Sequence, residues 1–202
     1  MSDPRRLVIL DGGPHASGAV GTLLSDVAHG AREAGGEVEV FRAYDMRIAA
    51  CIACGPDATP GYCVLHDDMD AAYEAMHRAH AIVVGSPIYF DTVSGPLKLF
   101  IDRCNCVTPL VTLSDGSLGM RPKWARTRRA AFVTACSDQH PYDLAERTVR
   151  GFLKWVGARW EVTVAWPHAD GHTGGPPEDV RIRARTVGRR LIVSDPLSVE
   201  KA

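Results

Sequence analysis

The chain has 202 residues, of which 46% are hydrophobic and 23% charged, with a formal net charge of -1. This length suits one α/β domain, and the balanced charge argues against nucleic acid or an acidic membrane surface as a partner. No stretch is apolar enough for a signal peptide or a membrane span, so we expect a cytoplasmic protein whose six cysteines are thiols, ligands or redox groups.

The hydrophobic pattern predicts five strands that alternate with helices. Strands are expected at residues 5–11, 37–42, 81–84, 129–135 and 161–166, and helices at 20–34, 69–78, from about 94, 142–157 and 178–193. This alternation is typical of βαβ units around a parallel sheet covered on both faces. We therefore expect an α/β fold, a flavodoxin-like doubly wound sheet of order 2-1-3-4-5 in three α/β/α layers.

Three segments depart from this pattern within a single domain at 1–202. Residues 43–67 form a loop that holds Cys51, Cys54 and Cys63, residues 105–128 form an excursion before the fourth strand, and residues 194–202 form a tail. The sequence contains no internal repeat and no low-complexity tract.

Three loops are expected to meet at one end of the sheet. They are residues 12–19, 86–94 and 135–138, and each follows the carboxyl end of a predicted strand. Open α/β sheets bind ligands outside the carboxyl ends of their strands. The sequence therefore predicts a ligand site formed by these loops.

The first of these loops has the chemistry of a phosphate site. It joins a strand to a helix N-terminus, where free backbone N–H groups and the helix dipole attract anions. Gly13 and Gly18 let the backbone come close, Ser17 adds a hydroxyl donor and His15 a partial positive charge. The loop is neither GxxxxGK[ST] nor GxGxxG, which disfavours a P-loop and a dinucleotide fingerprint. A Gly/Pro turn without a ligand is the alternative.

The second loop suits a flat ring system. Pro87 stiffens it, and Ile88, Tyr89 and Phe90 supply apolar and aromatic surface beside the backbone. The alternative is an ordinary strand-to-helix connection in which the tyrosine and the phenylalanine belong to the core.

Together these stretches resemble the NAD(P)H-dependent FMN reductase family, in particular its branch close to the iron–sulfur flavoproteins. The family pattern of strand, Gly-Ser-Pro-Arg-x-x-x-Asn-Thr and helix corresponds to GGPHASGAV at 12–20. GAREAG at 30–35, the cysteine loop with DDM at 67–69, and GSPIYF at 85–90 through IDR at 101–103 also match. The likeness is close over the first half and follows element order only in the second.

The resemblance implies bound FMN, with NADPH or NADH as electron donor and a small molecule as acceptor. It implies that Gly13, His15, Ser17 and Gly18 hold the phosphate, that Pro87, Ile88, Tyr89 and Phe90 border the isoalloxazine, and that Thr134, Ala135, Cys136 and Ser137 form a third wall. The cofactor carries the chemistry in such enzymes, so no residue is predicted to be catalytic. The resemblance also implies a homodimer whose second subunit closes over the flavin.

Two departures from the family pattern concern the phosphate. Ala19 and Val20 replace the Asn-Thr pair, and His15 replaces an arginine. Each lost hydrogen bond would weaken binding by about 1–3 kcal/mol, whereas backbone donors survive any substitution. We expect FMN binding that is weakened but retained.

The cysteine loop departs from the family in its third thiolate. Cys51, Cys54 and Cys63 resemble three ligands of the CxxCxxC…C cluster loop, but Asp57 stands where the remaining cysteine is expected. A [4Fe–4S] cluster normally takes four cysteine ligands, so no metal is predicted. Zinc held with His66, and a redox pair of Cys51 with Cys54, remain alternatives.

Two rival functions stay open. One is a non-enzymatic, flavin-binding electron carrier, which would show no steady turnover with NAD(P)H. The other is a family member that binds a different ligand in the same place, a reading that Ala19 and Val20 favour. The acceptor (flavin, quinone or another aromatic) and the preference between NADH and NADPH do not follow from the residues.

Overall fold

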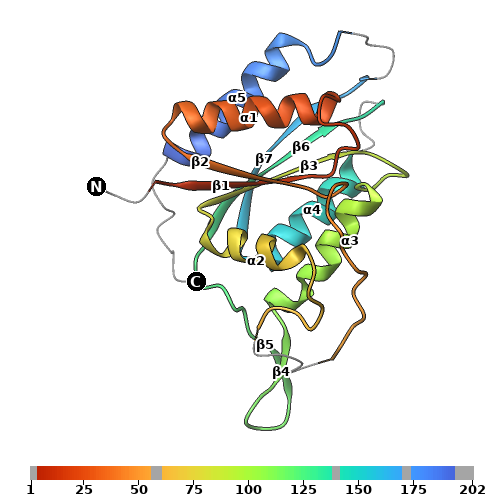
Figure 1. The fold of residues 1–202 in the computed structure, drawn as a ribbon, viewed down its shortest axis with the longest axis vertical. Helices are drawn as coiled ribbons and strands as arrows, with labels where there is room; N and C mark the ends of the chain where they lie inside the picture. The colour runs from red at the N-terminus through yellow and green to blue at the C-terminus, as the bar shows by residue number, and fades with distance from the viewer. Residues whose placement is uncertain (1–3, 56–60, 138–141, 170–173, 194–202) are drawn as a thin grey trace.

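The computed structural model describes residues 4–55, 61–137, 142–169 and 174–193. Its centre is a five-stranded parallel sheet of order β2-β1-β3-β6-β7 (Figure 1). The strands are β1 Arg6–Asp11, β2 Glu37–Arg42, β3 Ala81–Pro87, β6 Arg128–Ala135 and β7 Ala158–Trp166. Because β6 and β7 are the fourth and fifth strands of this sheet, the predicted order 2-1-3-4-5 is confirmed.

Helices cover both faces of the sheet (Figure 1). Within the described residues they are α1 Ala19–Glu33, α2 Met69–Arg78, α3 Gly95–Arg103, α4 Asp143–Trp155 and α5 Glu178–Val193, with a short 3-10 turn at Cys104–Val107. Helices α1 and α5 pack with one core cluster, and α2, α3 and α4 with the other. Inward side chains of β1, β3 and β6 alternate between the two clusters, as a strand period of two requires.

The predicted excursion at 105–128 contains regular structure that the sequence pattern did not reveal. Strands β4 Leu110–Thr112 and β5 Leu118–Met120 pair antiparallel and protrude from the lower end of the molecule in Figure 1. Each strand has only three residues, which is too short for a recognisable alternation. β7 also begins at Ala158, three residues before the expected start. A register shift opposite Ala130 and Ala131 interrupts the alternation of β7, so the sequence pattern does not reveal its first residues.

Helices α1 and α5 approach at backbone distance in the second half of α1. A Cβ added at Gly30 would lie 1.9 Å from the carbonyl oxygen of Arg185, and one at Gly188 would lie 1.9 Å from that of Val27. Only glycine permits this approach. Arg185 also joins Asp26 across the same contact, with Nη2 donating to the carboxylate at 3.0 Å. Helix α1 is therefore held against α5 by close backbone packing and by an ion pair.

Within the described residues, no helix combines the length and apolar character needed to span a bilayer.

Candidate functional site

The three predicted loops leave the sheet side by side. β1, β3 and β6 are neighbours, with Asp11 opposite Gly85 and Pro87 opposite Ala135 at their carboxyl ends. Residues 12–18, 88–94 and 136–137 therefore begin at one edge of the sheet. The expected convergence is confirmed, although Asp138, the last residue of the predicted third loop, lies outside the described residues.

The N-terminus of α1 presents unpaired backbone donors. Gly18 is the N-cap, with its own N–H donated to the carbonyl of His15 at 3.0 Å and its carbonyl accepting from Thr22 at 2.8 Å. The N–H groups of Ala19, Val20 and Gly21 have no acceptor within the helix. Three N–H groups beside a helix dipole form a site for an anion such as a phosphate.

Gly21 allows the loop to fold over the first turn of α1. A Cβ at this position would lie 2.1 Å from the carbonyl oxygen of Ala16, a contact that no side chain can make. The glycine is therefore required by the conformation of the loop at the first turn of α1. The sequence analysis did not single it out, since a glycine inside a helical stretch carries no distinctive signal.

Two of the predicted phosphate residues have free side chains. His15 and Ser17 are exposed, and within the described part of the chain neither side chain makes a hydrogen bond. Both are available to a ligand at the α1 N-terminus. The structure thus leaves these two residues as candidate donors, and their contact with FMN stays a prediction.

The backbone N–H of Gly13, which was expected to face the phosphate, has a partner within the chain. It donates to Asp11 Oδ1 at 2.7 Å, so this group is already paired. Asp11 is 3% exposed, and its Oδ2 accepts from Arg42 Nη1 at 2.7 Å. Burial raises the pKa of Asp11, against the lowering effect of the Gly13 N–H and of Arg42. Asp11 holds the start of the loop, and the sequence offered only one hint of it, an acidic residue at the end of an apolar run.

Hydrogen bonds fix the second loop against its neighbours. Ser86 Oγ accepts from the Ser94 N–H at 3.0 Å and donates to the carbonyl of Pro87 at 2.7 Å, while Thr134 Oγ1 donates to the carbonyl of Ser86 at 2.8 Å. The hydroxyl oxygen of Ser94, at the N-cap of α3, is buried and has no hydrogen-bond partner among the described residues. An unpaired buried hydroxyl at this end of the sheet is a second polar group that a ligand could satisfy.

The aromatic part of the second loop is a tight turn. Tyr89 and Thr92 exchange two backbone hydrogen bonds of 3.0 and 3.2 Å, and Phe90 and Asp91 both have left-handed backbone, with φ of 50° and 62°. Phe90 is 102% exposed and Tyr89 45% exposed. Of the four predicted ring-bordering residues, Pro87 and Ile88 are half-buried and the two aromatics face outward. The alternative that the aromatics belong to the core is therefore wrong.

The third loop is held by the edge strand. The Cys136 N–H donates to the carbonyl of Trp166 at 3.1 Å, and the Cys136 carbonyl accepts from the Ala169 N–H at 2.9 Å. Thr134, Ala135 and Cys136 are buried, whereas Ser137 is exposed. Only Ser137 of these four presents its side chain to solvent, so the third wall consists mainly of backbone.

The cysteine loop is anchored by one buried arginine. The side chain of Arg103 is 0% exposed and donates to the carbonyls of Ala49 (2.9 Å) and Leu65 (3.0 Å) and to both carboxylate oxygens of Asp67 (2.5 and 3.2 Å). It thus joins the two ends of the loop to α3. Burial by itself would raise the pKa of Asp67, but the Arg103 hydrogen bond and the N–H groups of Ala49 and Met69 lower it below its usual value.

The cysteines themselves do not form a metal site among the described residues. Cys51 and Cys54 are exposed, Cys63 is half-buried, and the proposed further ligand His66 pairs with Asp70 at 3.1 Å. Within the part of the chain that the structure describes, no group of three or more histidine, cysteine, aspartate or glutamate residues is arranged to hold an ion. Asp57 lies outside that part.

Comparison with known proteins agrees with this geometry. The model of the family described as NADPH-dependent FMN reductase matches residues 5–168. The chain belongs to this family. An iron-sulfur flavoprotein of Methanosarcina thermophila is 31% identical to this FMN reductase family member over 158 residues, 78% of this chain and 76% of the relative. A protein of Archaeoglobus fulgidus named NAD(P)H dehydrogenase (quinone) is 28% identical over 184 residues, 84% of this chain and 87% of the relative.

Another relative is matched over a shorter span. An iron-sulfur flavoprotein of Methanocaldococcus jannaschii is 32% identical over 98 residues, so that match spans 48% of this chain and 51% of the relative. Among solved structures, an NAD(P)H:quinone oxidoreductase from Methanothermobacter marburgensis superposes with a TM-score of 0.71 at 19% identity, covering 94% of this chain and 100% of the other. At that identity the superposition establishes the flavodoxin-like fold of this FMN reductase family member.

Proposed function

We propose that this family member is an FMN-dependent NAD(P)H oxidoreductase that reduces a small acceptor. The observation that carries the proposal is the first turn of α1. Its N–H groups at Ala19, Val20 and Gly21 have no acceptor in the described part of the chain, and they lie close to the exposed His15 and Ser17. Family membership supports FMN as the phosphate-bearing ligand. The relative named NAD(P)H dehydrogenase (quinone) supports a nicotinamide donor and an aromatic acceptor.

The residues of the first loop fit the phosphate end of FMN without the family's side-chain pair. Val20 is 4% exposed and packs into the core between α1 and the sheet, so it fills space rather than reaching a ligand. Three backbone donors and two polar side chains remain for a dianionic phosphate. Because each neutral hydrogen bond contributes only about 0.5–1.5 kcal/mol, we propose that FMN binds but is partly lost during purification.

The second and third loops would hold the ring. FMN, when bound, supplies the redox chemistry by accepting hydride from the nicotinamide and passing two electrons to the acceptor. Pro87 and Ile88 are held in place by the Ser86 and Thr134 hydroxyls and offer a rigid edge, and the exposed Tyr89 and Phe90 lie at the outer side. Fixed N–H groups at this edge would stabilise charge that develops on reduction. No acid or base from the chain is needed.

We also propose a homodimer in which the second subunit covers the open side of this site. The support is the exposed pair Tyr89 and Phe90, because a fully exposed phenylalanine on a left-handed turn is not stabilised by packing within its own chain. A single shared face for the nicotinamide and the acceptor would give ping-pong kinetics.

A visible spectrum of the freshly purified protein, reconstituted with FMN and titrated anaerobically with NADPH, tests the function. We expect a flavin spectrum, a rise in melting temperature with FMN, and rapid bleaching by NADPH. Steady turnover with a quinone distinguishes the enzyme from an electron carrier. Unchanged thermal stability and unchanged flavin fluorescence at saturating FMN would rule the proposal out.

A further inference from the structure

The hairpin of β4 and β5 has an apolar face that is open to solvent. Leu110 pairs with Met120, and Thr112 with Leu118, so these four side chains lie on one face of the hairpin. Leu110 is 47% exposed, and Leu118 and Met120 are each 60% exposed. On the opposite face Val111 is only 8% exposed. The protein therefore covers one face of the hairpin and leaves three large apolar side chains open on the other.

Hydrogen bonds give this hairpin a defined conformation. At its tip the Leu113 N–H donates to the carbonyl of Ser117 at 2.8 Å, and the Ser117 N–H donates to Asp115 Oδ1 at 2.9 Å. At its base the Lys123 N–H donates to the carbonyl of Val107 at 2.9 Å. A two-stranded hairpin alone is at most marginally stable in water, and an exposed apolar patch on a fixed element marks an interaction surface.

Helix α3 connects the hairpin to the aromatic turn at Tyr89 and Phe90. The turn precedes α3 and the hairpin follows it, beyond the lower end of the helix (Figure 1). Leu99 lies at the centre of α3 and is also exposed. Exposed apolar side chains thus occur before, within and after this one helix.

The charges on the outer side of α3 match each other in an antiparallel arrangement. Lys98 and Asp102 lie one turn apart and form an ion pair of 2.7 Å. About a two-fold axis at the centre of α3, Lys98 of one copy would face Asp102 of the other, whereas a parallel arrangement would bring like charges together. The same axis would bring the hairpin of each copy to the aromatic turn of the other.

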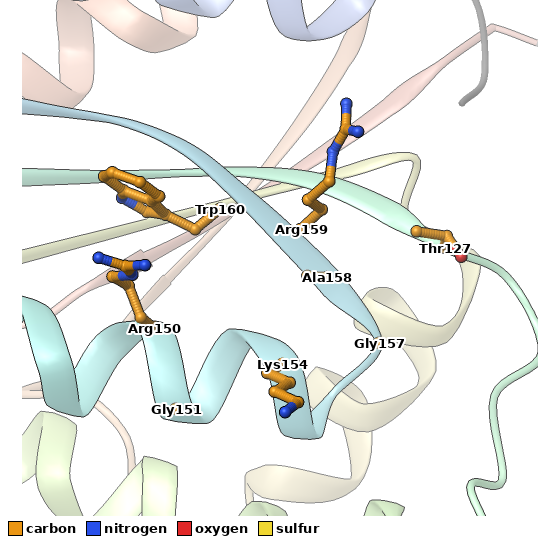
Figure 2. Close-up of a pocket in the computed structure, with 8 residues that line it drawn as sticks. All are labelled: Thr127, Arg150, Gly151, Lys154, Gly157, Ala158, Arg159 and Trp160. Carbon is orange, nitrogen blue, oxygen red and sulfur yellow. The ribbon is translucent and has the colours of Figure 1, made fainter. Parts of the chain in front are cut away.

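Helix α4, on the same face of the sheet, offers no comparable surface in its second half. Its exposed side chains from Arg147 onward are cations, namely Arg147, Arg150 and Lys154. In Figure 2 the side chain of Arg150 extends toward Trp160 of β7, and its guanidinium lies 4.3 Å from the ring centre. Two copies that met through this half of α4 would bring like charges together, so the expected contact is along α3.

We propose that a second copy of this chain binds along α3, antiparallel to the first, with the β4–β5 hairpin of each copy on the Tyr89–Phe90 turn of the other. Leu118 and Met120 would cover the exposed Phe90, so the rim of each site is complete only in the dimer. This deepens the homodimer of the proposed function, and it rests on that function only in placing FMN beside the turn. A membrane or an unrelated protein would account for the apolar side chains but not for the self-matching charges.

Sedimentation of the full chain without FMN tests the interface. The parent should be a dimer at about 10 µM, as a dissociation constant of ~1 µM or less gives. Leu118→Asp places a charge in the apolar contact and should raise the dissociation constant about 100-fold. Ile182→Asp makes the same change at a 54% exposed leucine-sized residue of α5, away from this surface, and should remain dimeric.

Photo-crosslinking tests the arrangement. Benzoylphenylalanine in place of Leu118 should cross-link to residues 88–94 of the other copy, which mass spectrometry identifies after exchange with isotope-labelled parent. The proposal is overturned if the parent is monomeric at about 100 µM, if Leu118→Asp dimerises as Ile182→Asp does, or if the cross-links fall elsewhere. A dimer with these contacts that fails to bind FMN would remove the proposed function and leave the interface standing, and a monomer that binds FMN would do the reverse.

Discussion

Two loops of this protein use their polar backbone groups in opposite ways. The first loop, residues 12–18, leads to an α1 N-terminus at which the N–H groups of Ala19, Val20 and Gly21 have no acceptor among the described residues. The cysteine loop, residues 43–67, has carbonyls at both ends that accept from the buried Arg103. The first loop therefore leads to backbone donors that a ligand could use, whereas the carbonyls at the ends of the cysteine loop are hydrogen-bonded within the chain.

This difference separates a binding loop from an anchored one better than composition does. Both loops contain glycine and residues that resemble family motifs, and both follow a strand of the sheet. A buried polar group without a partner is costly, so the chain pairs such groups unless a ligand or water does. The unpaired donors of the first loop point to a ligand, and the paired groups around Arg103 point to a structural role.

The largest expected effect comes from removing the anchor of the cysteine loop. Arg103→Met leaves Asp67 and the Ala49 and Leu65 carbonyls without their donor, and should lower the free energy of unfolding by about 3–5 kcal/mol. Urea denaturation measures the change. Arg183→Met, at an exposed position of α5, is the control and should stay within about 0.5 kcal/mol. A loss below about 1 kcal/mol for Arg103→Met would contradict the anchoring role.

The next effect concerns the first loop and should appear in ligand binding. Gly21→Ala places a Cβ against the Ala16 carbonyl and displaces the loop from the α1 donors. FMN affinity should fall about 100-fold, equivalent to two lost hydrogen bonds of ~1.4 kcal/mol. Fluorescence titration of FMN measures it, and circular dichroism confirms the fold. Gly151→Ala, which has open space, is the control. An affinity within about threefold of the parent would show that the loop does not hold the phosphate.

A smaller effect, of opposite sign, should follow from adding a charge to the first loop. His15→Arg restores the residue type of the family pattern at an exposed, unpaired position. A charge-assisted hydrogen bond to phosphate should tighten FMN binding about tenfold. His29→Arg, on helix α1 but near its C-terminal end, should leave the affinity unchanged. Equal gains in the two variants would mean that only net charge matters.

The sequence predicted the sheet because each of its strands carries a clear apolar or alternating pattern. β1 and β3 are buried on both faces and appear in the sequence as continuous apolar runs. The order of strands and the meeting of the three loops followed from the alternation of five strands with helices. The hairpin β4–β5 was missed because strands of three residues carry too little pattern. The start of β7 was misplaced because the register shift interrupts its alternation.

The candidate site was predicted in outline and not in its hydrogen bonds. The loops and the exposed His15 and Ser17 followed from local sequence. The pairing of Gly13 with Asp11, and of Arg103 with residues 36 to 54 positions away, depends on contacts that only the folded sheet creates. No local pattern distinguishes a free N–H from a paired one. Sequence therefore indicates where a ligand would bind, and the structure shows which donors remain for it.

The smallest expected effect is a pH dependence of the anchored loop. The pKa of Asp67 is lowered in the folded chain, so its contribution to stability is complete above the unfolded value of 3.8 and is lost as the pH falls from there through the folded pKa. Asp67→Asn should therefore cost about 1 kcal/mol at neutral pH and almost nothing in strong acid. Urea denaturation of both proteins across that range measures the difference. A deficit of the same size at every pH would mean that Asp67 acts through its shape and hydrogen bonds alone, and that the charge of Arg103 is not what secures the loop.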